Sequence, residues 1–416
     1  MKILIVNTTD IQGGAARAAY RFHKALLGQN VDSQMLVQSK SSDDFTVIGP
    51  QSKVQKAFGK LRPTLDSLSV RKYKDRTKTL FSPNRVPFSN VVDKINNINP
   101  DIVHLHWIAG GMLRIEDFVK IKVPIVWSLH DMWAFTGGCH YDEECSAYQN
   151  QCGTCPVLGS NKLQDLSRKV WLRKQETFGK IANLYIIGLS RWLADCAKQS
   201  SLFQDTPVFS LPNPIDTSTF APFDKQQARA LLNLPQDKNL VLFGAIGATS
   251  DPRKGFKELA EALRVTHLDA DNTELVVFGS SQPKTSQGFK QKAHYLGQLH
   301  DDVSLRVLYS AADVMIVPSL QENLSNAIME SLACGTPVVG FAIGGNSDLI
   351  EHQITGYLAK PYSVTDLAQG IEWVMNASNY QEISQSSREK VLREFDSQVV
   401  AKKYIDLYNQ IIKGAV

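Results

Sequence analysis

The chain has 416 residues, a formal net charge of +4 and a charged fraction of 21%. At roughly 100 to 200 residues a domain this length predicts two or three domains, and the composition is that of an ordinary globular protein. So mild a charge gives no general argument for a nucleic-acid-binding protein. No apolar run approaches the roughly 20 residues of a membrane span, and the apolar start is too short for a signal peptide, so we expect a cytoplasmic protein.

The chain opens with an apolar strand over residues 2–6, a turn with two glycines and a helical pattern over residues 15–27. Gly13 and Gly14 let the backbone approach a ligand at the helix start, where N–H groups have no partner. A plain strand-to-helix turn explains the pattern equally well.

Residues 52–78 are strongly basic, with only Asp66 and Asp75 as acids, and apolar side chains are interleaved among the cations. A basic amphipathic stretch of this kind can lie on an anionic membrane surface, which predicts peripheral membrane contact. The alternative is a solvated helical excursion of the first domain.

Two nearly continuous apolar runs, residues 101–107 and 124–129, predict buried parallel strands. The second run delivers His130 to its carboxyl end, which is the functional edge of such a sheet. His104 and His106 are expected to be satisfied by neighbours, so His130 is the better candidate for a functional histidine.

Four cysteines cluster over a short span, and the last two form a C-x-x-C pair: Cys139, Cys145, Cys152 and Cys155. In a reducing compartment such a cluster predicts a structural zinc ion rather than disulfides. Free buried thiols, or two disulfides in an oxidising compartment, are the alternatives.

Strands over residues 184–189 and 207–211 complete the first sheet, and the prolines of the following segment LPNPIDTSTF mark a boundary. A second strand-and-helix pattern then begins at residues 239–243. We therefore predict an N-terminal domain over residues 1–216 and a C-terminal domain over residues 217–396.

Arg253 and Lys254 precede a helical pattern over residues 255–264. Two cations at a helix N-terminus suit a departing diphosphate, whose negative charge grows as its bond to a sugar breaks. Ordinary solvated surface cations are the alternative reading.

The stretch over residues 314–345 predicts a strand, a polar loop, a helix from about residue 326 to residue 333, and a second strand. Glu322 lies in the loop and Glu330 follows on the helix, so the two carboxylates bracket a helix N-terminus that attracts anions. This arrangement suits a phosphorylated sugar, whose hydroxyl groups donate to carboxylates.

The same stretch resembles the donor site of family-four retaining glycosyltransferases of the GT-B fold. The likeness lies in two glutamates separated by seven residues and in the following G-x-P-V-V run, Gly335 to Val339. The resemblance implies that Glu330 holds the ribose hydroxyls of the donor and that Glu322 binds hydroxyls of its sugar. The intervening residues expected at the nucleotide sugar are Asn323, Leu324 and Ser325.

The resemblance extends to other positions. It implies that Gly14 lies near the donor phosphates, that His130 faces the donor sugar, and that Gly297 and Leu299 read the base. Lys254 matches the family's lysine. Ala245 and Ile246 stand where an arginine is expected, so we expect Arg253 to take its place.

The resulting prediction is an α/β protein of two Rossmann-like doubly wound domains facing a central cleft, with a C-terminal helix over residues 397–416 that packs back on the first domain. By resemblance, the protein would move a hexose from a nucleotide sugar, with UDP as the default, to a saccharide or lipid-linked saccharide in cell-surface polysaccharide synthesis. The configuration would be retained, and no catalytic metal or cofactor is expected because the cations and the helix N-terminus balance the diphosphate charge.

Three other functions are alternatives to this prediction. A nucleotide-sugar 2-epimerase uses the same double fold but needs no acceptor. A sugar phosphorylase would need a pyridoxal lysine, for which there is no supporting motif. A zinc-stabilised nucleic-acid-binding protein would use the cysteines and the basic stretch, but a pI near 8.6 is too modest to favour it.

Overall fold

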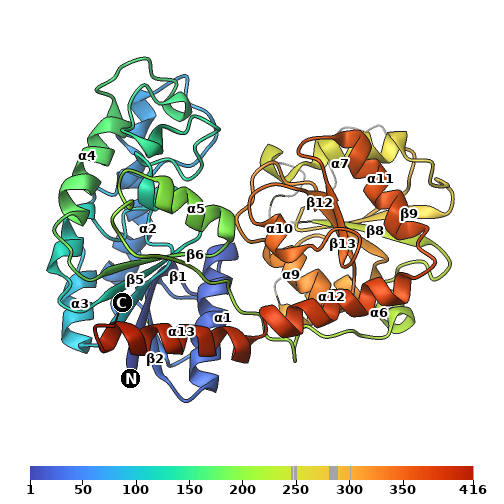
Figure 1. Cartoon of the computed structure of the whole chain (residues 1–416), viewed down its shortest axis with the longest axis horizontal. Coiled ribbons are helices and arrows are strands. Elements are labelled where there is room, and N and C mark those ends of the chain that lie inside the picture. The colour runs from blue at the N-terminus through green and yellow to red at the C-terminus, as the bar shows by residue number, and fades with distance from the viewer. Residues whose placement is uncertain (245–246, 248–250, 281–288, 300, 416) are drawn as a thin grey trace. The chain divides into compact units, whose positions relative to one another are not determined.

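A computed structural model describes residues 1–244, 247, 251–280, 289–299 and 301–415. Its contacts divide the chain into two compact units, one of Met1–Asn213 with Val400–Val416 and one of Pro214–Val399. Each unit is built on its own parallel sheet with helices on both faces (Figure 1). This architecture confirms the predicted α/β class with two doubly wound domains.

The first unit contains a seven-stranded sheet in the order β3-β2-β1-β4-β5-β6-β7, with every pairing parallel. Its strands are β1 (Lys2–Thr9), β2 (Asp32–Ser39), β3 (Val47–Ile48), β4 (Ile102–Leu105), β5 (Ile125–Leu129), β6 (Leu184–Gly188) and β7 (Val208–Ser210). The central strands are apolar throughout because both faces of the sheet are covered.

Helices cover both faces of this sheet. The α-helices of this unit are α1 (Gly14–Gly28), α2 (Lys53–Ser67), α3 (Val91–Ile98), α4 (Leu166–Phe178), α5 (Arg191–Gln199) and α13 (Ser397–Ile412). On one face Phe22 of α1 and Tyr404 of α13 pack against Ile3 and Ile5 of β1. On the other face, Ile95 of α3 packs against the apolar strand side chains that point to that face. The last helix is therefore part of the core of the first unit.

The second unit contains a six-stranded sheet in the order β10-β9-β8-β11-β12-β13, again parallel throughout. Its strands are β8 (Asn239–Gly244), β9 (Thr273–Phe278), β10 (Ala293–Tyr295), β11 (Val314–Val317), β12 (Val338–Phe341) and β13 (Gly356–Ala359). The chain moves outward from β8 in one direction and from β11 in the other. The adjacent pair β8 and β11 is therefore the point at which the strand order reverses.

The helices of the second unit are α6 (Lys225–Leu231), α7 (Phe256–Val265), α8 (Asp302–Ala311), α9 (Asn326–Ala333), α10 (Asn346–Leu349), α11 (Val364–Met375) and α12 (Tyr380–Glu394). Leu259 of α7 and Leu367 of α11 fill one face of the sheet together with Val241 and Ile316. Over the described ranges, no helix is both long enough and apolar enough to cross a membrane.

Candidate active site

In the second unit, the loops that follow β8 and β11 leave the carboxyl edge of two adjacent strands where the strand order reverses, the usual place for a ligand in this type of sheet. Gly255 ends the first loop with a left-handed φ of 72°, and a Cβ at this position would overlap the carbonyl oxygen of Pro318 in the second loop. The two loops therefore pack with no room for a side chain between them.

This close approach pairs two predicted site residues. Nζ of Lys254 lies 3.0 Å from Oε2 of Glu322, and the Ser319 hydroxyl donates to the same oxygen at 3.4 Å. The side chain of Lys254 is 27% exposed and that of Glu322 is 14% exposed, so both remain partly open to solvent. An amine and a carboxylate thus stand side by side at the reversal point, where they can meet an anion and a sugar hydroxyl.

Arg253 is held differently from its neighbour. Its guanidinium donates to Asp251, with Nη2 at 2.8 Å from Oδ2, and its side chain is 42% exposed. Burial alone would raise the pKa of Asp251, but the hydrogen bonds from Arg253 hold it below its usual value. Ala245 and Ile246, where the arginine of the resemblance was expected, lie outside the described residues.

Glu330 is buried on α9, with 4% of its surface exposed. The hydroxyl of Tyr309, from α8, donates to its Oε2 at 2.8 Å. Ser325 caps the N-terminus of α9, since its hydroxyl accepts from the backbone N–H of Ile328. A buried carboxylate one turn from a capped helix start is positioned by the fold rather than left to solvent.

The other nucleotide-site predictions fall into two groups. Asn323 and Leu324 are buried in the loop before α9, together with the capping serine. Gly297 and Leu299 follow β10, and Gly297 has a left-handed φ of 67° and accepts a hydrogen bond from the backbone N–H of Gly279 at 2.7 Å. Both segments leave the carboxyl edge of the same sheet.

In the first unit, the carboxyl ends of β4 and β5 carry a row of histidines. His104 bonds to the hydroxyls of Tyr408, at 2.5 Å, and Ser128, at 2.8 Å, as neighbours were expected to satisfy it. Nδ1 of His106 lies 2.9 Å from Nε2 of His130, while its own Nε2 has no hydrogen-bond partner within the described residues. Burial lowers the pKa of His130 to about 4, so its ring is neutral at pH 7.

A pocket opens beside this row, lined by His106, His130, Asp131 and His140. Nδ1 of His140 lies 2.6 Å from Oδ2 of Asp131, to which the indole N–H of Trp107 also donates. Burial alone would raise the pKa of Asp131, but His140 holds it below its usual value. The pocket therefore offers a neutral histidine and a carboxylate. Gly14 lies elsewhere on the carboxyl edge, at the exposed start of α1.

The predicted zinc site finds no support. Cys139, Cys152 and Cys155 are buried and Cys145 is exposed, all as free thiols. Among the residues that the structure describes, no three side chains of the metal-binding types are grouped to hold an ion. Two of the buried thiols, those of Cys139 and Cys155, belong to the apolar core of the first unit.

Several of these partners escaped prediction from the sequence. Tyr309 belongs to an ordinary amphipathic helix, and nothing in its spacing marks it as the partner of Glu330. The pairing of Arg253 with Asp251 could have been inferred, because the acid caps the short turn that carries the cation. The His106–His130 contact was signalled only by two histidines at the ends of neighbouring strands.

Comparison with known proteins finds a family match within the second unit. Residues 238–377 match the family of glycosyl transferases group 1. A D-inositol 3-phosphate glycosyltransferase of Xylanimonas cellulosilytica is 26% identical over 332 residues, which cover 75% of this chain and 72% of that protein.

Two solved structures are similar to this protein over nearly the whole chain. Sucrose-phosphate synthase from Thermosynechococcus elongatus superposes with a TM-score of 0.70 at 20% identity, covering 99% of both chains. Anabaena HepE in complex with UDP gives a TM-score of 0.64 at 16% identity, covering 99% of this chain and 100% of that one. The fold shared with these proteins is GT-B.

Proposed function

We propose that this chain, which has the GT-B fold, is a group 1 glycosyltransferase that transfers a hexose from a nucleoside diphosphate sugar to a saccharide or lipid-linked saccharide. The UDP complex of Anabaena HepE supports UDP as the nucleotide of the donor. We place the reaction in the synthesis of a cell-surface polysaccharide, with the configuration at the anomeric carbon retained.

One observation carries the proposal. Lys254 and Glu322 meet at the reversal point of the second sheet, on the same edge as the start of the helix that carries the buried Glu330. A cation, two carboxylates and a helix N-terminus are the groups that a sugar diphosphate requires, because it combines a dianionic centre with several hydroxyl donors.

The proposed roles follow from charge and burial. Lys254 and Arg253 balance the charge that grows on the diphosphate, Glu322 accepts from hydroxyls of the sugar, and Glu330 accepts from the ribose. Asn323, Leu324 and Ser325 line the path of the donor, and Gly297 and Leu299 meet the base. With these cations in place, the proposed reaction needs no catalytic metal or cofactor.

In the proposed reaction, the bond between the anomeric carbon and the β-phosphate oxygen breaks as a bond to the acceptor oxygen forms on the same face. The acceptor hydroxyl gives its proton to the departing phosphate oxygen, so no protein nucleophile is needed. The protein then contributes orientation and charge stabilisation, which together can supply most of the rate enhancement. We also place the enzyme peripherally at a membrane, with residues 52–78 as the contact.

A thermal-shift series with UDP-, GDP- and ADP-sugars tests the donor class. A ligand at a hundredfold excess over its dissociation constant stabilises the folded state by about 2.7 kcal/mol. We expect one UDP-sugar to raise the midpoint of wild type and of Glu389→Ala, an exposed control on α12, but not of Glu330→Ala. No shift of wild type with any sugar nucleotide would reject the donor proposal, whereas conversion of the donor without acceptor would favour an epimerase.

A further inference from the structure

Helix α2 is attached to the first unit by its polar side chains. Arg62 is buried, and its guanidinium donates to the carbonyl oxygens of Gly111 at 2.6 Å and of Val86 at 2.8 Å. Asp66, one turn later, accepts from the backbone N–H groups of Asn84 at 3.1 Å and of Arg85 at 2.8 Å. The helix therefore turns charged groups inward, which is the reverse of an ordinary surface helix.

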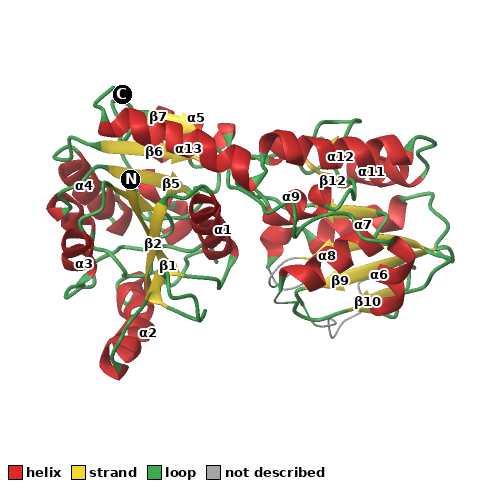
Figure 2. Ribbon diagram, turned by 90° about the horizontal axis from the view of Figure 1, so that it is seen from below, coloured by secondary structure: helices red, strands yellow, loops and turns green. Residues whose placement is uncertain are grey.

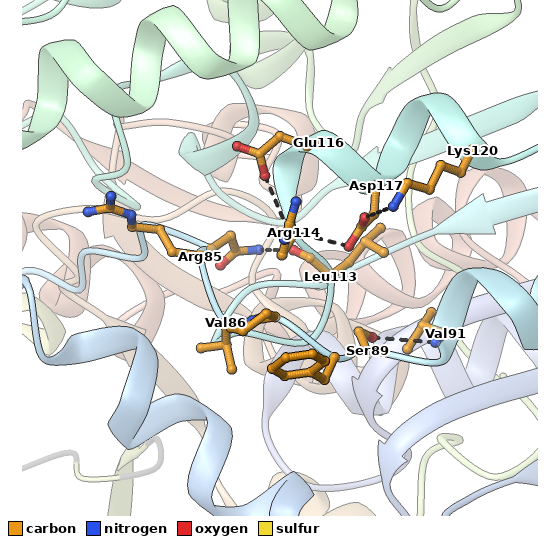
Figure 3. Close-up of polar contacts among 12 residues, drawn as sticks. Arg85, Val86, Ser89, Val91, Leu113, Arg114, Glu116, Asp117 and Lys120 are labelled. Atoms are coloured by element: carbon orange, nitrogen blue, oxygen red, sulfur yellow. Dashed lines mark hydrogen bonds and ion pairs between the residues drawn. The ribbon is translucent and has the colours of Figure 1, made fainter.

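The loop that receives these contacts is itself held in place. The hydroxyl of Ser89 donates to the carbonyl oxygen of Met112 at 2.8 Å and accepts from the N–H of Val91 at 3.4 Å. Figure 3 shows this contact beside the ion pairs of Arg114, and shows the side chain of Arg85 directed away from that cluster. The attachment of α2 is thus a fixed part of the unit.

Because charged side chains of α2 point inward, apolar side chains of the same helix form a row that faces outward. The row comprises Val54, Phe58, Leu61, Leu65 and the adjoining Leu68, which are 78%, 36%, 54%, 41% and 50% exposed. Spacings of four and three residues place these side chains on one side of the helix. Figure 2 shows α2 extending away from the sheet of its unit. Contiguous exposed apolar surface of this kind marks an interaction site rather than a solvated face.

A second row is entirely cationic. Lys53, Lys56 and Lys60 repeat at spacings of three and four residues, on a side of the helix about 120° from the apolar row. Beyond the helix, up to residue 78, the exposed charged side chains are again cations except for one acid: Arg71, Lys72, Lys74, Asp75, Arg76 and Lys78. The surface around the apolar row is therefore strongly positive.

We infer that α2 docks on the surface of a lipid bilayer that contains anionic headgroups, with the apolar row entering the acyl boundary and the lysine row at headgroup level. The inference specifies how the proposed membrane contact is made, and it does not depend on the proposed chemistry. A second copy of α2 fits less well, because pairing two apolar rows would bring two lysine rows together with no acid to oppose them.

Vesicle flotation of the full chain tests this docking surface without any donor or acceptor. We expect the protein to float with vesicles of phosphatidylcholine and phosphatidylglycerol, to float less with phosphatidylcholine alone, and to be released by salt. Leu61→Ser and Leu65→Ser should each weaken the partition about tenfold, since each removes a buried leucine from the bilayer. Lys56→Glu with Lys60→Glu should abolish the preference for anionic vesicles.

Leu172→Ser, on an exposed leucine of α4 in the same unit, is the matched control and should float like wild type. Circular dichroism should show all of these variants folded, because the substituted side chains face solvent. Equal flotation of wild type and of Leu61→Ser, or no flotation at all, would overturn the inference. So would a dimer of wild type that Leu61→Ser converts to a monomer in the absence of vesicles. The sugar-nucleotide thermal shift is read separately, so either proposal can fail alone.

Discussion

The amine of Lys254 lies 3.0 Å from the carboxylate of Glu322, and the two residues belong to loops that follow adjacent parallel strands. An ion pair in this position limits the orientations of both side chains before a ligand arrives. A diphosphate that binds nearby attracts the same amine, while the freed carboxylate oxygen can accept from a hydroxyl. When a ligand binds, Lys254 and Glu322 can therefore give up their mutual contact, the amine for the diphosphate and the carboxylate for a hydroxyl.

Removing the cation should affect turnover more than folding. Lys254→Met is expected to lower kcat by about 10² to 10³, the range for loss of one group that stabilises developing charge. Its effect on stability should stay below about 1 kcal/mol, because the pair is partly exposed. Lys257→Met, on the exposed face of α7, is the control and should retain wild-type rates. Steady-state kinetics with a UDP-sugar decide the matter, and an unchanged kcat for Lys254→Met would contradict the assigned role.

The Glu330 carboxylate and the Tyr309 hydroxyl should contribute differently to donor binding and to stability. Glu330→Gln keeps the size of the side chain but removes its charge, so the dissociation constant for the sugar nucleotide should rise about tenfold or more. Tyr309→Phe removes only the donor to Oε2, and should cost about 1 kcal/mol of stability with a smaller change in affinity. Isothermal titration and thermal unfolding measure the two effects. If both variants bound like wild type, the carboxylate would not contact the donor.

Much of this framework could be predicted from local pattern. The apolar run that became β11 and the helix from Asn326 to Ala333 were predicted at their observed bounds. Buried parallel strands lack the alternation of apolar and polar residues that half-exposed strands show, and this difference can be seen in a single sequence. The α/β class and the parallel sheets followed from that signal.

What could not be predicted depends on contacts between elements. The basic stretch suggested an amphipathic helix, but nothing in it showed that Arg62 and Asp66 point inward, because their partners are backbone groups of a distant loop. The zinc prediction finds no support for a related reason. Cysteine spacing constrains the chain only along its length, and of the four thiols only those of Cys139 and Cys155 belong to the apolar core.

The histidine row predicts a specific acid sensitivity. Burial lowers the pKa of His104 to about 3 and of His130 to about 4, whereas unfolded histidines titrate near about 6.5. The unfolded state therefore binds more protons between these values, and the stabilisation is complete above pH 6.5 and lost as the pH falls toward about 4. Thermal unfolding should show a falling midpoint across this window.

The variant His104→Gln measures the contribution of one histidine of this row to the acid sensitivity. It keeps a polar side chain near Ser128 and Tyr408 but cannot titrate, so the acid-induced fall of the midpoint should be shallower than in wild type. His352→Gln, on an exposed histidine of the second unit, should leave the fall unchanged. A midpoint that is flat between pH 7 and about pH 5 in wild type would show that these histidines are not neutral by burial.

A last prediction concerns the glycine that permits the two loops to meet. Gly255→Ala adds a Cβ in a left-handed conformation and against the carbonyl oxygen of Pro318, so the loop carrying Lys254 must move away from Glu322. We expect a loss of stability well beyond the roughly 1 kcal/mol of the backbone conformation alone, and a fall in kcat like that of Lys254→Met. Gly110→Ala is the matched control, because Gly110 has a φ of 63° but the nearest atom to an added Cβ is 3.7 Å away. Thermal unfolding and steady-state rates on both variants separate strain from displacement: if Gly255→Ala behaved like Gly110→Ala in both, the contact between the loops would not position the lysine.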